Sequence, residues 1–256
     1  MTDPIEQHLE TIIHAFVRKP LVMLFEPDAR GELIGQGSGT LVRAASGRAA
    51  LLTASHVVKD VSTMHALASN GAFRDVIANV RAMPGVDVAL AELRASAADL
   101  NAVAIDAGLL GNPDDPSVTK DDTVVAVGYP EQVTATTFDH ARGLAQKWHG
   151  DMIYRTVVAG VNRDAISLVW TFGEISEAAS IYKEAGFPAA GRINHKMPRG
   201  MSGGAVWKQV RGSGLVWTVD EGFRLVGILY EFKNQKQLAV PARLWAEWIH
   251  QQLAMM

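Results

Sequence analysis

Cysteine is absent from the 256 residues of this chain. Disulfide bonds, thiolate catalysis and cysteine-based zinc sites are therefore excluded. The eight histidines could still bind a metal, but none shows the paired helical spacing of a His-Glu-x-x-His zinc motif. The sequence thus contains no recognisable metal site.

An excess of basic residues is also missing. Lys and Arg number 24 against 27 Asp and Glu, which gives a net charge of −3. Proteins that bind nucleic acid need cationic side chains to neutralise phosphates, so we expect no nucleic-acid partner. With 48% apolar and 20% charged residues, the composition is that of a folded globular protein rather than a disordered one.

Long apolar runs are lacking as well. No window approaches the roughly 18 apolar residues of a membrane-spanning helix. The acidic, polar N-terminal segment has neither the basic nor the apolar region of a secretory signal. We therefore expect no membrane association and a cytoplasmic location.

A helix is predicted at each end of the chain. The first follows a capping Asp3, has Pro4 at its first position and ends before Pro20. Its apolar residues recur at helical spacing and form one stripe: Ile5, Leu9, Ile12, Ile13, Phe16 and Val17. We expect this stripe to pack on the body of the protein, with partner binding as the alternative. The second helix is predicted from about Ala242 to Leu253.

Between these helices, the chain consists mostly of short apolar runs separated by turn residues. Such spacing predicts an all-β protein, either a sandwich or a barrel. The runs cover residues 21–25, 39–42, 49–53, 73–80, 86–93, 101–105, 123–127, 152–158, 166–172, 215–219 and 225–230. The polar segment 111–122 is the best candidate for a linker between two units, and residues 174–184 have a helical pattern.

The segment most suggestive of chemistry is GMSGG at 200–204. A serine between glycines can lie in a tight turn that leaves its hydroxyl exposed, because glycine permits the backbone conformations that such a turn needs. The N–H groups of Gly200 and Ser202 could then face a negative charge that develops on a substrate oxygen. Taken alone, the motif fits an ordinary glycine-rich turn equally well.

A nucleophilic serine needs a base, and the base needs an acid that orients it. His56 comes just after the apolar run 49–53, and Asp87 lies at the start of another run. Either residue alone would more often be exposed or locally hydrogen-bonded. The chain order His56, Asp87, Ser202 makes a catalytic interpretation the better one.

Together these segments resemble the trypsin-like, chymotrypsin-fold serine peptidases. The resemblance rests on TASH at 53–56, DVAL at 87–90 and GMSGG at 200–204. The LAVP segment at 238–241, just before the last helix, is most similar to the bacterial, disulfide-free HtrA-type branch. The resemblance extends over about residues 20–252.

This resemblance implies two six-stranded antiparallel β-barrels, with the active site in the cleft between them. It divides the chain into an N-terminal helix at 1–19, a first barrel at 20–112, a second barrel at 113–240 and a C-terminal helix at 241–256. Barrels remove exposed sheet edges, which suits a sequence of many short strands.

The resemblance also implies a serine endopeptidase that hydrolyses protein or peptide substrates through an acyl-enzyme and needs no cofactor. Ser202 would attack the peptide carbonyl, His56 would take its proton and return it to the leaving amine, and Asp87 would hold the imidazole. The N–H groups of Gly200 and Ser202 would form the oxyanion hole. Such an enzyme must be kept from digesting its host, so regulation by a protein partner is a further hypothesis.

Several positions depart from the pattern of the resembled family. Met201 precedes the nucleophile, where Asp or Asn is usual, so a buried N-terminal ammonium would find no carboxylate there. Tyr230, Glu231 and Phe232 stand in place of a Ser-Trp-Gly run whose serine contacts the triad aspartate. Phe232 could therefore narrow the substrate pocket.

Lys196 and Met197 belong to the segment that would line this pocket, and Lys196 occupies the position that sets preference for the residue before the cleaved bond. Lys196 could select acidic residues there, or it could be an ordinary solvated lysine. Glu231 could also pair with Lys196 and cancel its charge. Of these alternatives, we expect Lys196 to be an ordinary solvated lysine.

Two other functions remain open at this point. A trypsin-like scaffold without activity would be a binding module, although no triad residue is missing here. GMSGG also fits the Gly-x-Ser-x-Gly elbow of an α/β-hydrolase esterase, with Asp220 and His250 following in that fold's order. An elbow must lead into a helix, however, and the residues after Gly204 have the pattern of a strand.

Overall fold

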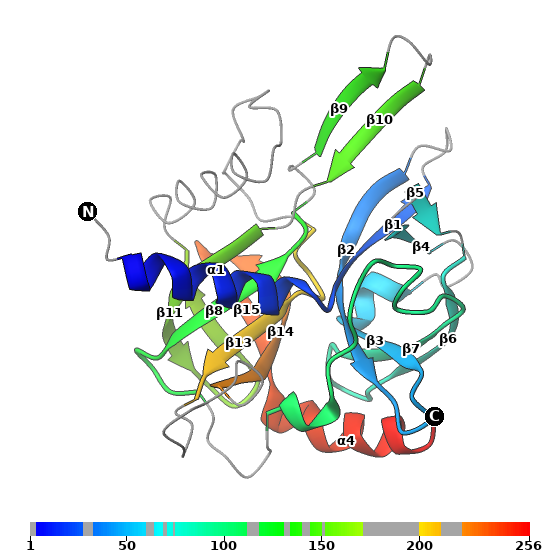
Figure 1. Ribbon diagram of the computed structural model, residues 1–256. Coiled ribbons are helices and arrows are strands. Elements are labelled where there is room, and N and C mark those ends of the chain that lie inside the picture. Colours follow the sequence, from blue (N-terminus) through cyan, green and yellow to red (C-terminus); the bar gives the residue numbers. More distant parts are fainter. Residues whose placement is uncertain are drawn as a thin grey trace.

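The computed structural model describes residues 4–27, 33–59, 64–68, 71–73, 75–111, 118–130, 134–139, 144–149, 152–170, 200–210 and 222–256. They form two β-bodies side by side, with helix α1 (Pro4–Arg18) across one body and helix α4 (Ala242–Ala254) beneath both (Figure 1). Several predictions fall outside the described residues: the capping Asp3, linker residues 112–117, the helix at 174–184, the strand at 215–219, and Lys196 and Met197.

The first body is an antiparallel sheet of seven strands, in the order β5-β4-β1-β2-β3-β7-β6. The strands are β1 (Leu21–Pro27), β2 (Leu33–Arg43), β3 (Ala49–Thr53), β4 (His65–Ala68), β5 (Gly71–Phe73), β6 (Ile77–Ala82) and β7 (Ala89–Leu93). The single run predicted at 73–80 is wrong, because Asp75 adopts a left-handed backbone with φ of 48° between β5 and β6. The strand predicted at 101–105 is only a bridge from Ile105 to Val42.

The second body is a closed barrel in the order β11-β12-β15-β14-β13-β8. Its strands are β8 (Thr123–Gly128), β11 (Met152–Val161), β12 (Ile166–Val169), β13 (Ala205–Gln209), β14 (Phe223–Lys233) and β15 (Lys236–Pro241). Successive β8 side chains point to opposite faces, so Val124 and Ala126 fill the barrel while Val125 and Val127 pack outside it. A separate hairpin joins β9 (Thr134–Asp139) to β10 (Leu144–His149).

An apolar cluster joins the two bodies. It continues from the inside of the first sheet to α1, α4 and the outer face of the barrel. Phe16 of α1 packs edge-on against the buried Trp207, with 5.4 Å between ring centroids. Such an aromatic pair contributes about 0.5–1.5 kcal/mol beyond the area it buries. At its far end, α4 reaches the first sheet, where Leu253 O accepts a hydrogen bond from Ala45 N–H.

This architecture confirms the predicted all-β fold of two barrel-like bodies with a helix at each end. The first body has seven strands rather than the predicted six, counting the short hairpin β4–β5. The esterase alternative is wrong, because GMSGG leads into strand β13 and not into a helix. In the described part of the chain, no helix has the length and hydropathy needed to cross a membrane.

Candidate active site

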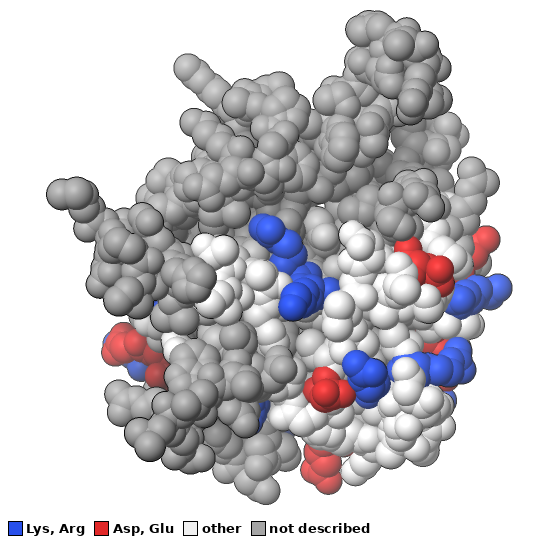
Figure 2. All heavy atoms as spheres, in the orientation of Figure 1, with Lys and Arg blue, Asp and Glu red and all other residues white. Residues whose placement is uncertain are grey.

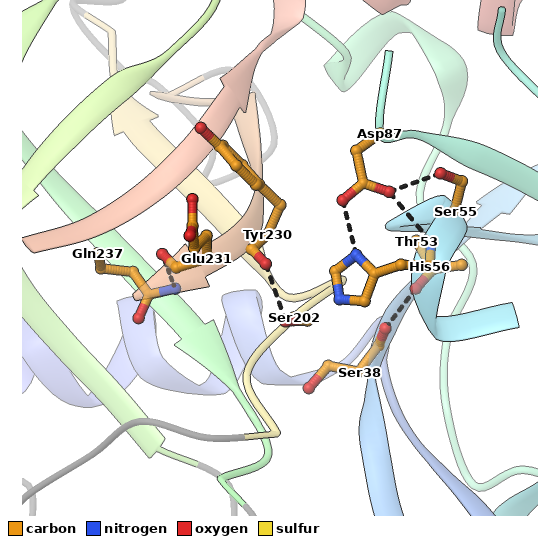
Figure 3. A network of polar contacts seen from close by, with 9 residues as sticks. All are labelled: Ser38, Thr53, Ser55, His56, Asp87, Ser202, Tyr230, Glu231 and Gln237. Atoms are coloured by element: carbon orange, nitrogen blue, oxygen red, sulfur yellow. Dashed lines mark hydrogen bonds and ion pairs between the residues drawn. The ribbon is translucent and has the colours of Figure 1, made fainter. Parts of the chain in front are cut away.

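His56 and Asp87 lie at the same edge of the first body and contact each other. His56 is in a short 3-10 helix, η1 (Ser55–Val58), directly after β3, and Asp87 is in the turn before β7. Because β3 and β7 are antiparallel and pair Thr53 with Ala89, the end of one meets the start of the other. His56 Nδ1 lies 2.6 Å from Asp87 Oδ2 (Figure 3).

Three hydrogen bonds hold the Asp87 carboxylate. Besides the His56 ring, Ser55 Oγ donates to Oδ1 at 2.5 Å and the His56 N–H donates to it at 3.0 Å. Burial raises the pKa of Asp87, but the bonds from His56 and Ser55 outweigh burial and lower this pKa from 3.8 to about 2. Asp87 is therefore ionised at neutral pH, and it favours the His56 tautomer that carries its proton on Nδ1 and leaves Nε2 free to accept another.

Ser202 lies in the turn that leads into β13, and glycines make this turn. Gly200 and Gly203 have φ values of 87° and 81°, where a residue with a Cβ would be strained. A Cβ on Gly203 would also lie 2.0 Å from Ser38 O and 2.1 Å from Thr53 Oγ1. Glycine at these positions therefore allows the serine turn to sit directly against the first body.

The Ser202 hydroxyl is bonded away from the histidine. Its Oγ donates to the Tyr230 carbonyl at 3.1 Å. In Figure 3, Ser202 lies between that carbonyl and the His56 ring. The structure thus brings the predicted nucleophile, base and acid into one site, with the nucleophile turned toward β14.

The loop 200–204 carries the two N–H groups that were predicted to form an oxyanion hole. Gly204 N–H donates to Met201 O at 2.9 Å. The peptide between Met201 and Ser202 is trans, so its carbonyl faces Gly204 while the Ser202 N–H faces the opposite side. Within the described residues, no acceptor is found for the N–H groups of Gly200 and Ser202.

Met201 anchors this loop without a charge. Its side chain is 0% exposed and belongs to the apolar cluster that fills the second barrel. Full burial of a methionine side chain contributes about 1.5–3 kcal/mol. The loop therefore has an anchor even though no carboxylate precedes the nucleophile.

Tyr230 stands where the resembled family has the serine that supports the triad aspartate. That support comes from Ser55 instead, through its hydrogen bond to Asp87 Oδ1. Tyr230 is only partly exposed, and burial together with the charges of Glu231 and Asp87 raises the pKa of its phenol. Its carbonyl accepts the hydrogen bond from Ser202, and its side chain packs against the apolar cluster that joins the two bodies.

The other predicted pocket residues of β14 face in different directions. Glu231 is exposed, whereas Phe232 is half-buried and packs edge-on against Trp170, with 5.7 Å between ring centroids. Because Lys196 and Met197 lie outside the described residues, their place in the pocket and the pairing of Lys196 with Glu231 stay predictions.

Beside Ser202, strand β14 presents an edge that no described strand covers. β14 pairs with β13 only as far as Ile228, opposite Ala205. Beyond that point, residues 231–233 pair with β15 alone. An extended peptide can add to such an edge through main-chain hydrogen bonds.

Three polar residues of the site were missed by sequence reasoning. Ser55 directly precedes the histidine, and Ser38 lies in the GSG segment 37–39 that reaches the serine turn. Gln237 is 1% exposed and donates from Nε2 to Glu231 O at 3.2 Å, while its Oε1 has no partner in the described residues. The only signal for Gln237 is a polar residue within an otherwise apolar strand.

The described surface carries charges of both signs. Figure 2 shows Lys, Arg, Asp and Glu side chains scattered over the described part of one face, without a gathering of one sign. Among the described residues, no group of three or more His, Asp or Glu is arranged to hold a metal ion.

Comparisons with known proteins agree with this geometry. The family model of the trypsin-like peptidase domain matches residues 37–214, a range that includes His56, Asp87 and Ser202. Among solved structures, an HtrA-type protease, AlgW with a serine-to-alanine substitution and a bound tripeptide, has a TM-score of 0.54 and 16% sequence identity. The match covers 95% of this chain and 63% of that one, so this chain spans less than two thirds of its length. No curated protein matches the chain.

Proposed function

Because the chain belongs to the trypsin-like peptidase family and is a serine protease, we propose that it is an endopeptidase that works through Ser202, His56 and Asp87 and an acyl-enzyme. The observation that carries the proposal is the 2.6 Å contact between His56 Nδ1 and Asp87 Oδ2, with Ser202 in the adjoining glycine turn. A base, its orienting acid and a nucleophile within one site are what acyl transfer requires.

The reaction begins with a change in the Ser202 side chain. Rotation about χ1 moves Oγ from the Tyr230 carbonyl to Nε2 of His56, which accepts the hydroxyl proton as Oγ bonds to the substrate carbonyl carbon. The ionised Asp87 stabilises the imidazolium that forms. The substrate oxygen becomes an anion, and the Gly200 and Ser202 N–H groups donate to it.

Collapse of this intermediate breaks the C–N bond. His56 gives its proton to the leaving amine, and the acyl group stays on Ser202 Oγ as an ester. A water molecule then loses a proton to His56 and attacks the ester, which releases a carboxylic acid and restores the serine. As the ester C–O bond breaks, His56 returns the proton to Ser202 Oγ, so the atoms and electrons balance with water as the only co-reactant.

We expect the substrate to be an extended segment of protein or peptide. The open edge of β14 beside Ser202 accommodates a strand. Regulation by a protein partner is part of the same proposal, because a bound peptide or protein that favours the rotated Ser202 side chain would raise activity.

One observation favours the second candidate, a catalytically silent binding module. The Ser202 hydroxyl is bonded to the Tyr230 carbonyl rather than to His56. A silent module would keep this arrangement when ligand binds, whereas an enzyme leaves it during each turnover.

A serine-directed peptidyl phosphonate distinguishes the two candidates. The protease should be labelled stoichiometrically at Ser202 and should hydrolyse a denatured protein substrate, and Ser202→Ala should lose both properties while remaining folded. Thr40→Val is the matched control, because it removes a buried hydroxyl that has no hydrogen-bond partner among the residues that the structure describes. A folded wild-type protein that resists labelling, with and without peptide ligands, would establish the binding module.

A further inference from the structure

Ser38 is a buried residue of the first body that touches the serine turn of the second. It lies on β2, is 0% exposed and uses all its polar groups. Its N–H donates to Ser202 O at 2.7 Å, and its carbonyl accepts from Thr53 Oγ1 at 2.7 Å. Its hydroxyl donates to Gly200 O at 3.3 Å and accepts from Tyr129 N–H at 2.7 Å.

From these contacts we propose that Ser38 is a positioning residue, which sets the geometry of the oxyanion hole from the opposite body. The inference rests on the proposed function, since an oxyanion hole matters only to a working acyl-transfer enzyme. Ser38 touches neither the substrate nor the reacting atoms, and it acts through the peptide groups of the loop.

The contacts of Ser38 fix the loop on both sides of Met201. Its hydroxyl holds the carbonyl of the peptide that follows Gly200, and its N–H holds the carbonyl of the peptide that follows Ser202. The peptide between them is held by the bond from Gly204 N–H to Met201 O. Two of these three consecutive peptide planes therefore depend on Ser38.

The Gly200 bond is the one on which the oxyanion hole depends most. Gly200 has a φ of 87° and no Cβ, so its backbone can rotate with little steric resistance. The Ser38 hydroxyl restrains the carbonyl of this residue, whose N–H is one of the two donors. The Gly200 N–H belongs to the preceding peptide, so this bond limits its direction only through the Gly200 Cα. Loss of the bond would allow the peptides on both sides of that Cα to turn.

The surroundings leave room for a serine in this position. A Cβ on Gly128 would lie 3.2 Å from Ser38 Oγ, and one on Gly37 would lie 2.7 Å from Ser202 O. These glycines allow β2 and β8 to come close to the loop. The Tyr129 N–H at the end of β8 then orients the hydroxyl so that its proton faces Gly200.

The test compares Ser38→Ala with Thr40→Val by steady-state hydrolysis. Thr40 lies two residues further along β2 and is equally buried, but its hydroxyl has no hydrogen-bond partner in the described part of the chain. Loss of an oxyanion donor slows serine proteases by about 10²–10³-fold in kcat, so loosening one should cost roughly ten- to a hundredfold. We expect this loss in kcat and in the rate of phosphonate labelling for Ser38→Ala, with KM changed by less than about threefold. Thr40→Val should match the wild type.

Each outcome has one interpretation. If the wild-type protein neither hydrolyses peptides nor reacts with the phosphonate, the proposed function fails and the inference fails with it. If the wild type is active and Ser38→Ala has the kcat of the wild type, only the inference is overturned. The same holds if Ser38→Ala changes KM by as large a factor as kcat.

A second pair of variants covers the case in which Ser38→Ala does not fold. Ser38→Thr and Ser38→Val have the same shape and differ only in the hydroxyl. If the hydroxyl positions the loop, Ser38→Thr should have a higher kcat than Ser38→Val at similar KM. Equal kcat values in these two variants would overturn the inference.

Discussion

The two halves of the active site are ordered by different physical means. In the first body, hydrogen bonds and a charge hold His56, Ser55 and Asp87 together, and the pKa of Asp87 is lowered to about 2. In the second body, the burial of Met201 and backbone hydrogen bonds hold the loop, while the hydroxyl of Ser202 is turned away from the base. In the proposed mechanism, the base is thus prepared before substrate arrives, whereas the nucleophile must rotate.

The free energy of the hydrogen bond between Ser202 and Tyr230 decides whether the resting position of the serine blocks catalysis. A neutral hydrogen bond such as that from Ser202 to the Tyr230 carbonyl contributes about 0.5–1.5 kcal/mol net. Breaking it lowers the fraction of primed enzyme by about tenfold at most, since 1.4 kcal/mol corresponds to a factor of ten. Side-chain rotation itself takes picoseconds to nanoseconds. If Ser202 is the nucleophile, the resting bond should therefore reduce activity modestly without abolishing it.

The largest effect should come from removing either half of the proton-transfer pair. Ser202→Ala and His56→Ala should each lower kcat on the order of 10⁶-fold, and the double variant should lose little more, because triad members act as a unit. Peptide hydrolysis measures the loss, and circular dichroism checks that each variant remains folded. Additive losses in the double variant would contradict the assignment.

Asp87→Asn should have the next largest effect. The amide cannot accept the Nδ1 proton as the carboxylate does, so the wrong His56 tautomer is favoured, and related serine proteases lose about 10⁴-fold in kcat. Steady-state hydrolysis measures the loss, with Asp75→Asn, an exposed position, as the control. Activity of Asp87→Asn within tenfold of wild type would mean that Asp87 does not orient the base.

How much of this site the sequence predicts depends on how far each contact reaches along the chain. His56 and Asp87 follow and precede paired strands, so their proximity can be expected once the strands are recognised. The bonds of Ser38 to Gly200 and Tyr129 span 162 and 91 residues and arise only when the two bodies pack. No local pattern marks such contacts, and for that reason Ser38 was missed.

Prediction of the fold from the sequence is limited in the same way. The alternation of short apolar runs and turns predicts the all-β class, which the structure confirms. The boundaries of β5 and β6 were wrong, because the left-handed backbone of Asp75 leaves no mark on the hydrophobic pattern of 73–80. Residues 101–105 read as a strand because they are apolar, but only Ile105 pairs, through a single bridge.

A smaller effect, confined to the second half of the site, is expected from Met201→Ala. Removing a fully buried methionine side chain should lower the free energy of unfolding by about 2–5 kcal/mol. Met201→Leu conserves the volume and should cost less than about 1.5 kcal/mol. Denaturant unfolding measures both. Equal stability of the two variants would show that packing of residue 201 does not anchor the loop.

The smallest effect concerns the stability that the first half of the site gains from its charge. The folded-state pKa of Asp87 is lowered from 3.8 to about 2, so its ionised form stabilises the fold above the unfolded-state value. This stabilisation is lost as the pH falls from about 4 through 2. Because 30% of the side chain is exposed, solvent screening reduces the contribution to about 1–2 kcal/mol at neutral pH.

Comparing wild type with Asp87→Asn by urea unfolding at pH 6 and pH 3 isolates this contribution. The stability difference between the two proteins should narrow by about 1 kcal/mol at the lower pH. At pH 3 the Asp87 carboxyl of the unfolded chain is mostly protonated, whereas that of the folded protein is still mostly ionised, and the asparagine of Asp87→Asn binds no proton in either state. Ser55→Ala should shrink the effect, since it removes one of the bonds that lower the pKa of Asp87. Asp75→Asn should leave the pH dependence of wild type unchanged. A difference between wild type and Asp87→Asn that stays constant from pH 6 to pH 3 would mean that charge does not hold this half of the site.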